Sequence, residues 1–270
     1  MEIGLLRDLL TALVGLLAGV LSGAFGVGGA TISTPGIRLL GVGPLVAVGT
    51  TLPAILPSAI SGGLRYRAEG LVDARAVAWT VPAGVAASVA GALAAGVVPG
   101  EGHVLQLLTA VLLGVSAWRM ASNLCDEDAA TGATGRAPAT GESPRRPSAL
   151  GLVAVGLVAG GLSGLLGIGG GAVMVPAFSQ IGLSVRTSVA TSLVCVGALA
   201  VPGTVTHTLV GNIDWRVALV LALAVVPGAR LGAAASLRLR DRRLTEVVAV
   251  FLGVVALVYG AGELAALRTG

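Results

Sequence analysis

The chain has 270 residues, of which 55% are hydrophobic and only 11% are charged, and its formal net charge is +4. Soluble domains carry about 25% charged residues, so this composition excludes a water-soluble globular protein and indicates a protein of the lipid bilayer. Nucleic-acid or other polyanion binding is excluded too, because the arginines lie at the ends of apolar runs, as in membrane proteins. The two cysteines, Cys125 and Cys195, form no metal or disulfide motif, and we expect no cofactor and no metal.

Apolar runs long enough to cross a bilayer, about 20 residues each, follow one another along the chain. A polar stretch at 121–149, rich in Gly, Pro, Asp and Glu, separates two groups of such runs and predicts a flexible aqueous linker. We therefore predict an all-α integral membrane protein with a first membrane repeat at 1–120 and a second at 150–270. The eight predicted hydrophobic segments are 9–27, 44–64, 76–98, 103–120, 150–168, 187–210, 215–236 and 244–267.

The two repeats are copies of one another, because residues 14–75 align onto residues 155–216 without a gap. Two fused copies of a membrane-embedded unit are typical of secondary transporters. Their arginines are distributed differently, however. The loop after the second segment is arginine-rich in the first repeat only, and the loop after the third segment is arginine-rich in the second repeat only. These two groups are Arg65, Arg67 and Arg75, and Arg238, Arg240, Arg242 and Arg243.

Under the positive-inside rule, this exchange predicts that the two repeats are inverted relative to each other. Each repeat then crosses the membrane an odd number of times, with both termini outside the cytoplasm and the linker inside. One segment in each repeat cannot be a simple span. The glycine-rich segments are the candidates, because glycines followed by Pro35 or Pro176 favour a broken or re-entrant helix.

These glycine clusters are also the first candidate site. Backbone without Cβ atoms can present N–H groups to a ligand, and the start of a half-helix favours an anion. We expect a substrate-binding role for Gly26, Gly28, Gly29, Gly167, Gly169, Gly170 and Gly171. The alternative, close packing between helices, is favoured for the preceding glycines Gly19, Gly23, Gly160 and Gly164.

Hydroxyl side chains recur at matched positions, where Thr50 and Thr51 of the first repeat correspond to Thr191 and Ser192 of the second. All four are candidates for contacts with substrate oxygens. The alternative is that each hydroxyl bonds to a carbonyl of its own helix.

Few charged residues fall within the segments. His207 could take up a proton or line an anion exit, or it could simply be solvated at the interface. Arg230 could be a counter-charge for an anion, or it could snorkel to the interface. Asp73 and Asp214, two residues before an arginine in each repeat, are expected to cap the following helices, with ion coupling as the alternative.

Several motifs occur in order in both copies. They are the Gly-x-x-Ala-Gly-x-x-Ser-Gly-x-x-Gly-x-Gly-Gly-Gly run at 156–171, the Gly-x-Ile-Asp-x-Arg turn at 211–216, the Pro-Gly-Ala-Arg-Leu-Gly-Ala run at 227–233, and their less complete counterparts in the first repeat. In these features the chain resembles the TauE/SafE family of sulfite exporters. The resemblance implies a multi-pass permease of the inner cell membrane for sulfite, sulfonates or related organosulfur anions. The first copy departs from the pattern at Ala30, Ser33 and Thr34, which stand where the second has Gly171, Met174 and Val175.

The leading hypothesis is thus a secondary transporter of small anions. A proton is a candidate coupling ion, and the chain could form a homo-oligomer. An anion channel or a non-catalytic membrane subunit is the alternative. We expect no enzymatic activity and no catalytic residue, because an enzyme would need a nucleophile paired with a base, or a metal cluster.

Overall fold

The computed structural model describes residues 2–95, 110–111, 113–122, 147–166 and 170–269, and these residues form helices and short connections without a β-strand. Most of the predicted linker, part of the segment at 103–120, and Gly167 and Gly169 lie outside them. The helices with complete bounds are α1 (Glu2–Phe25), α2 (Ala30–Leu39), α3 (Pro44–Ala68), α4 (Ala74–Ala95), α6 (Ala149–Leu166), α7 (Gly171–Gln180), α8 (Val185–Val210), α9 (Trp215–Arg238) and α10 (Asp241–Thr269).

The long helices follow the predicted segments closely, and the expected α-helical membrane protein is confirmed. Among the described residues, four helices are long and apolar enough to cross a membrane. These stretches are Gly4–Phe25, Val46–Ala68, Val185–Val210 and Trp215–Arg238. A shorter apolar stretch, Ala149–Gly164, belongs to α6.

Helices α2 and α7 each have 10 residues, a length of about 15 Å at 1.5 Å per residue. Helix α2 folds back along α1, because Gly36 lies against Val14 and Gly29 against Ala18. The prolines Pro35 and Pro176 lie inside α2 and α7. The prolines, which we expected to contribute to the breaks, therefore do not mark them, and α1 is followed by Gly26 and Gly28 with positive φ angles.

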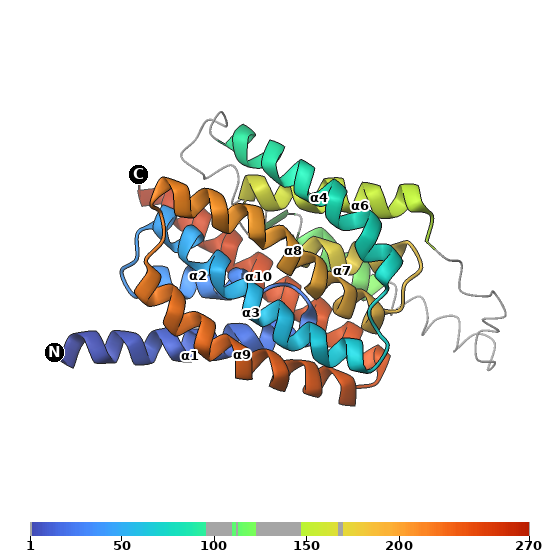
Figure 1. The fold of residues 1–270 in the computed structure, drawn as a ribbon, viewed down its shortest axis with the longest axis horizontal. Helices are drawn as coiled ribbons and strands as arrows, with labels where there is room; N and C mark the ends of the chain where they lie inside the picture. The colour runs from blue at the N-terminus through green and yellow to red at the C-terminus, as the bar shows by residue number, and fades with distance from the viewer. Residues whose placement is uncertain (1, 96–109, 112, 123–146, 167–169, 270) are drawn as a thin grey trace.

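Two pairs of helices form opposite sides of the bundle (Figure 1): α1 packs along α9, and α4 packs along α6. Both pairs are parallel. Along the first pair, Gly15 lies against Leu221 and Gly23 against Ala229. Along the second pair, positions 80 and 84 of α4 lie against positions 156 and 160 of α6 in the same order.

The contact between α1 and α9 is made by small residues, which allow the two backbones to approach closely. A Cβ atom on Gly19 would lie 3.0 Å from the backbone nitrogen of Ala229, and one on Gly228 would lie 3.0 Å from that of Val20. In the same way Gly160 of α6 lies against the backbone of Gly84. The packing role that we favoured for Gly19, Gly23 and Gly160 is confirmed.

Between the two pairs, α3 and α8 run antiparallel to each other, because Gly49 lies against His207 and Gly62 against Leu193. Helix α3 runs in the direction of α9, since Gly49 contacts Asn212 near the start of α9 and Ser61 bonds to Val226 farther along it. Thus α1, α3 and α9 run one way. Helices α4, α6 and α8 run the other way.

The bundle therefore has two ends, which we name the Arg7 end and the Arg67 end after the residues near the start of α1 and the end of α3. Of the described arginines, Arg7, Arg38 and Arg216 lie at the Arg7 end, where α1 and α9 begin and α2 finishes. Many more lie at the Arg67 end, in the last turns of α3 and α9 and at the starts of α4, α8 and α10. They are Arg65, Arg67, Arg75, Arg186, Arg238, Arg240, Arg242 and Arg243.

Candidate functional site

The glycine loops of the two repeats touch each other inside the bundle. Gly26 and Gly28, with φ angles of 67° and 78°, turn the chain after α1, and Gly170, with φ 67°, does the same before α7. A Cβ atom on Gly171 would lie 2.5 Å from the carbonyl oxygen of Val27. We name this contact, between residues 26–29 and 170–171, the glycine junction.

Ser192 of α8 joins the two halves of the glycine junction. Its Oγ donates to the carbonyl oxygen of Gly26 at 2.8 Å and lies 3.4 Å from that of Gly171. The side chain is fully buried. Of the four predicted hydroxyl residues, Ser192 is the one that the fold brings to the glycines of both repeats.

Two short helices begin at the glycine junction, α2 after Gly29 and α7 after Gly170. Neither start is capped by a side chain. The first amides of a helix lack partners within the helix, and the helix dipole makes its start electropositive. A helix start of this kind can bind a small anion, and a substrate-binding role of these glycines remains a prediction.

The junction is enclosed in this structure, because every residue from 22 to 30 is buried. Gly28 packs against Val196 of α8, and Gly26 packs against the backbone of Val189. The described residues of the junction are therefore shielded from solvent in this structure.

Two hydroxyls of the first repeat form a pair between α2 and α3. Thr34 and Thr51 are 3.1 Å apart at their Oγ1 atoms, and Thr51 also donates to the carbonyl of Val48 in its own helix at 3.0 Å. For Thr51 the alternative of a hydrogen bond to its own helix is therefore confirmed. In the second repeat, Val175 takes the place of Thr34, and the hydroxyl pair between α7 and α8 is instead formed by Ser179 and Ser188, at 3.2 Å.

Thr50 and Thr191 are fully buried, but they contact helix starts and not the glycines. The Oγ1 atom of Thr50 accepts a hydrogen bond from the backbone amide of Asp214 at 3.0 Å, and that of Thr191 accepts one from the amide of Asp73 at 3.1 Å. These bonds connect one repeat to the other. A substrate contact by either hydroxyl remains a prediction.

Both aspartates cap the helices that follow them, as expected. The Asp73 carboxylate accepts from the amide of Ala76 at 2.9 Å at the start of α4. The Asp214 carboxylate accepts from the amides of Arg216 and Val217 at 3.1 and 3.2 Å at the start of α9. Capping fixes the position of the two amides to which Thr50 and Thr191 bind.

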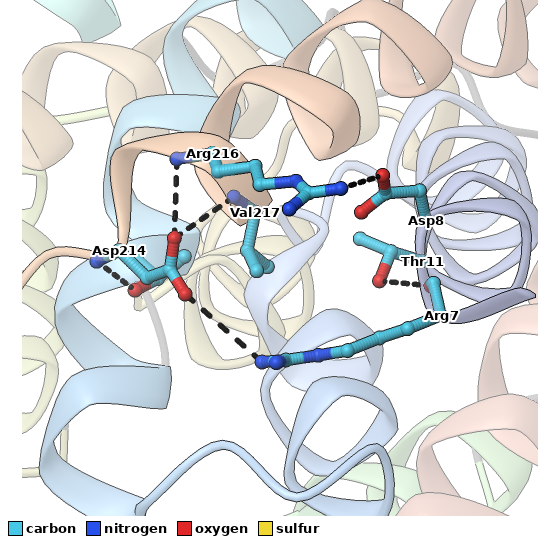
Figure 2. A network of polar contacts seen from close by, with 7 residues as sticks. Arg7, Asp8, Thr11, Asp214, Arg216 and Val217 are labelled. Atoms are coloured by element: carbon cyan, nitrogen blue, oxygen red, sulfur yellow. Dashed lines mark hydrogen bonds and ion pairs between the residues drawn. The ribbon is translucent and has the colours of Figure 1, made fainter. Parts of the chain in front are cut away.

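An ion-pair network ties α1 to α9 at the Arg7 end (Figure 2). Arg216 pairs with Asp8 at 2.6 Å, and Arg7 lies 4.0 Å from the carboxylate of Asp214. Thr11 donates to the carbonyl of Arg7 at 2.8 Å and holds that turn of α1. We name these four charged residues the α1–α9 ion pairs.

The two single charged candidates lie in different surroundings. His207 is half-buried near the end of α8, and its Nδ1 atom is buried without a hydrogen-bond partner. A Cβ atom on Gly49 would lie 2.8 Å from that Nδ1, so the ring packs against α3 and is not simply solvated. Arg230 is exposed on the surface of α9. Their roles toward an anion or a proton remain predictions.

Sequence reasoning missed three residues of these contacts. Arg7 and Asp8 lie just before the first predicted segment, and their partners are more than 200 residues away. Tyr66 is fully buried and donates to the carbonyl of Gly23 at 2.6 Å. The sequence signals that could have identified these residues were a tyrosine and two neighbouring charged residues at the ends of otherwise apolar segments.

Known proteins similar to the chain are transporters by name. It is 27% identical over 259 residues to the probable membrane transporter protein YunE of Bacillus subtilis, covering 92% of this chain and 93% of that protein. It is 24% identical over 268 residues to the probable membrane transporter protein MJ0441 of Methanocaldococcus jannaschii, with the same coverage. A partial match, 34% identical over 137 residues, covers 44% of this chain and 22% of the probable membrane transporter protein MamO of Paramagnetospirillum magneticum.

No solved structure gives a significant match to the chain. The family model described as sulfite exporter TauE/SafE matches residues 11–259, a range that includes both glycine clusters, both capping aspartates and every helix from α2 to α9. The chain is therefore a multi-pass membrane transporter protein that belongs to the TauE/SafE family.

Proposed function

We propose that this transporter moves small oxyanions, such as sulfite or organosulfonates, through the glycine junction. The observation that carries the proposal is the meeting of one glycine loop from each repeat at Ser192, where α2 and α7 begin. Such an oxyanion offers several acceptor oxygens to the first backbone amides of α2 and α7, which no side chain caps. Ser192 donates its proton to Gly26 and so positions the two loops. The family name points to the same class of substrate.

The groups at the glycine junction favour moderate affinity for an anion over tight binding. No lysine or arginine contributes to the junction among the described residues, so the positive potential there would come from the helix starts. A helix start contributes up to about 2 kcal/mol toward a charge in favourable geometry. Moderate affinity suits a carrier, because the substrate must be released on the other side.

We propose further that the two halves are inverted repeats with broken or re-entrant glycine segments. In the sequence alignment, α1 corresponds to α6, α3 to α8 and α4 to α9, and the members of each pair run in opposite directions in the bundle. The arginine-rich Arg67 end lies in the cytoplasm under the positive-inside rule. The N-terminus then lies on the outer side of the cell membrane.

Alternating access is the mechanism that this arrangement supports. The glycine junction is enclosed, and the α1–α9 ion pairs hold the Arg7 end together. At the equivalent place in the other repeat, where α6 meets α4, Ser148 and Ala149 stand where Arg7 and Asp8 would be. The two ends are thus held by different forces, and movement of the α1–α9 pair relative to the α4–α6 pair would expose the junction to each side in turn.

Flux measurements in proteoliposomes test the proposal. Wild-type protein should take up sulfite or a simple sulfonate in a saturable way and should support counterflow, which separates a carrier from a channel. Uptake with and without an imposed pH gradient tests proton coupling in the same vesicles. Absence of counterflow with every sulfur oxyanion would contradict a sulfur-oxyanion carrier.

A matched pair of variants then tests the site. Ser192→Ala removes the hydroxyl that joins the glycine loops, and we expect at least tenfold slower uptake. Ser61→Ala is the control, because Ser61 is also buried and donates to a carbonyl of another helix, that of Val226 at 2.9 Å. Equal uptake by both variants, with equal thermal stability, would contradict the assignment of the junction.

A further inference from the structure

A second concave feature lies on the outer surface of the bundle, where α3, α4 and α8 meet. It is a cavity of about 580 Å³ with almost entirely apolar walls, and a single charged residue, Arg67, lines it. Its floor is made of small residues such as Ala59, Gly63 and Gly197. We name it the Arg67 groove. It is separate from the glycine junction, since no residue of that junction lines it.

The length and position of the groove match one leaflet of a bilayer. Along α3 it extends from Arg67 to Leu56, which is about 16 Å at 1.5 Å per residue. Half of a hydrocarbon core of about 30 Å is about 15 Å. The groove therefore begins at the membrane surface, at the Arg67 end, and finishes near the middle of the membrane.

The rims of the groove face outward from the bundle. Ile60 and Leu64 on α3 are 61% and 58% exposed, and Val201 on α8 is 46% exposed. Exposed aliphatic side chains along a membrane helix face lipid, so the groove opens toward the acyl chains of the bilayer. An apolar chain lying in it would be in contact with protein on its inner side and with lipid on its outer side.

Arg67 differs from the arginine beside it on α3. Arg65 pairs with Glu69 one turn away at 3.6 Å, so a carboxylate already offsets its charge. Arg67 has no ion-pair partner among the described residues, and its side chain lines the groove. A guanidinium group at the headgroup level that no described carboxylate offsets favours a phosphate, to which it can donate two parallel hydrogen bonds.

We propose that the Arg67 groove is a binding site for an anionic phospholipid of the surrounding bilayer, with one acyl chain in the groove and the headgroup phosphate on Arg67. The volume fits a ligand of this kind, since specific small-molecule sites span roughly 300–1,000 Å³. The charge selects an anionic lipid over a zwitterionic one. The lipid would fill the space between α3 and α8, the central helices of the bundle, without entering the glycine junction.

Native mass spectrometry of the full chain, released from micelles doped with phosphatidylglycerol or phosphatidylcholine, tests the site. Wild-type protein should retain phosphatidylglycerol in preference to phosphatidylcholine. In Arg67→Gln this retention should fall about fivefold, the ratio that corresponds to about 1 kcal/mol for one arginine near a membrane surface. In Arg65→Gln it should stay at the wild-type value.

Two further variants keep the test informative. Arg67→Lys preserves the charge and should keep most of the preference for the anionic lipid. Ala78→Leu places a larger side chain in the groove from an exposed position of α4, and it should reduce retention of both lipids. Equal losses in Arg67→Gln and Arg65→Gln, or unchanged retention in both Arg67→Gln and Ala78→Leu, would overturn the proposal.

Discussion

The side chain of Thr50 accepts a hydrogen bond from the backbone amide of Asp214 at 3.0 Å, so α3 of the first repeat holds the start of α9 in the second. The equivalent bond from the second repeat to the first is also present. Thr191 on α8 of the second repeat accepts from the amide of Asp73 at 3.1 Å, at the start of α4 in the first. Each repeat thus fixes the entry of one long helix of the other, at opposite ends of the bundle.

Removing either bond should destabilise the protein by a similar amount. Thr50→Val and Thr191→Val leave a partly buried amide without an acceptor, which costs about 1–3 kcal/mol. Thr→Ser at either position keeps the oxygen and should stay close to wild type. Thermal unfolding in detergent measures the difference. A loss in Thr50→Val without one in Thr191→Val would show that the two bonds are not equivalent in strength.

Two neighbouring glycines of α6 should respond in opposite ways to alanine. A Cβ atom on Gly160 would lie 2.6 Å from the Cα of Gly84 on α4, whereas nothing lies within 4 Å of the Cβ position on Gly161. We expect Gly160→Ala to lower stability by about 1–3 kcal/mol through overpacking of α6 against α4. Gly161→Ala should be neutral or stabilise by up to about 1 kcal/mol. Unfolding in detergent compares the two, and equal stability would contradict the close helix contact.

The glycine junction offers a similar contrast within one loop. Gly28 has φ 78°, and a Cβ atom there would lie 2.7 Å from Cγ1 of Val196. Gly29 has φ −61°, and its Cβ position makes only ordinary contacts, the nearest at 3.5 Å. Gly28→Ala should therefore lose stability by about 1–3 kcal/mol from backbone strain and reduce uptake, while Gly29→Ala keeps its stability near wild type. Transport and thermal unfolding measured on the same preparations check this, and a stable, fully active Gly28→Ala would contradict the loop geometry.

Hydropathy predicted the long helices well because a membrane span must be both long and apolar. The predicted segment at 187–210 and helix α8 at Val185–Val210 differ by two residues at the start and agree at the end. The bounds of α2 and α7 did not follow from hydropathy, since a 10-residue helix inside an apolar run has no hydropathy signal of its own. Glycine density showed where the chain breaks, but not that α2 returns along α1.

The candidate site was predictable in its residue types but not in its contacts. Ser192 and Thr191 were selected together as repeated hydroxyls, yet one joins the glycine loops and the other holds a helix start. Adjacent positions on a helix point about 100° apart, so their partners depend on which helices surround α8. The ion-pair partners of Asp214 and Arg216 could not be predicted for the same reason, because the sequence does not show that α1 packs beside α9.

The α1–α9 ion pairs should control how readily the Arg7 end opens. Asp8→Asn and Arg216→Gln each remove the pair at 2.6 Å, and a cysteine at position 212, just before the network, reports opening. In a background with Cys125→Ser and Cys195→Ala, we expect Asn212→Cys to react faster with a membrane-impermeant maleimide in either variant. The increase should be at most about fivefold, because a solvent-exposed pair contributes up to about 1 kcal/mol.

The matched control for this experiment is Glu69→Gln, which breaks the exposed Arg65–Glu69 pair at the opposite end of the bundle. It should leave the labelling rate at position 212 unchanged. Combining Asp8→Arg with Arg216→Asp restores a pair with reversed charges and should bring the rate back toward wild type. Acceleration by Glu69→Gln equal to that by Asp8→Asn would indicate a general loosening of the bundle. A rate that is unaffected by any of these changes would mean that packing of Gly15, Gly19 and Gly23 against α9 is enough to keep this end closed.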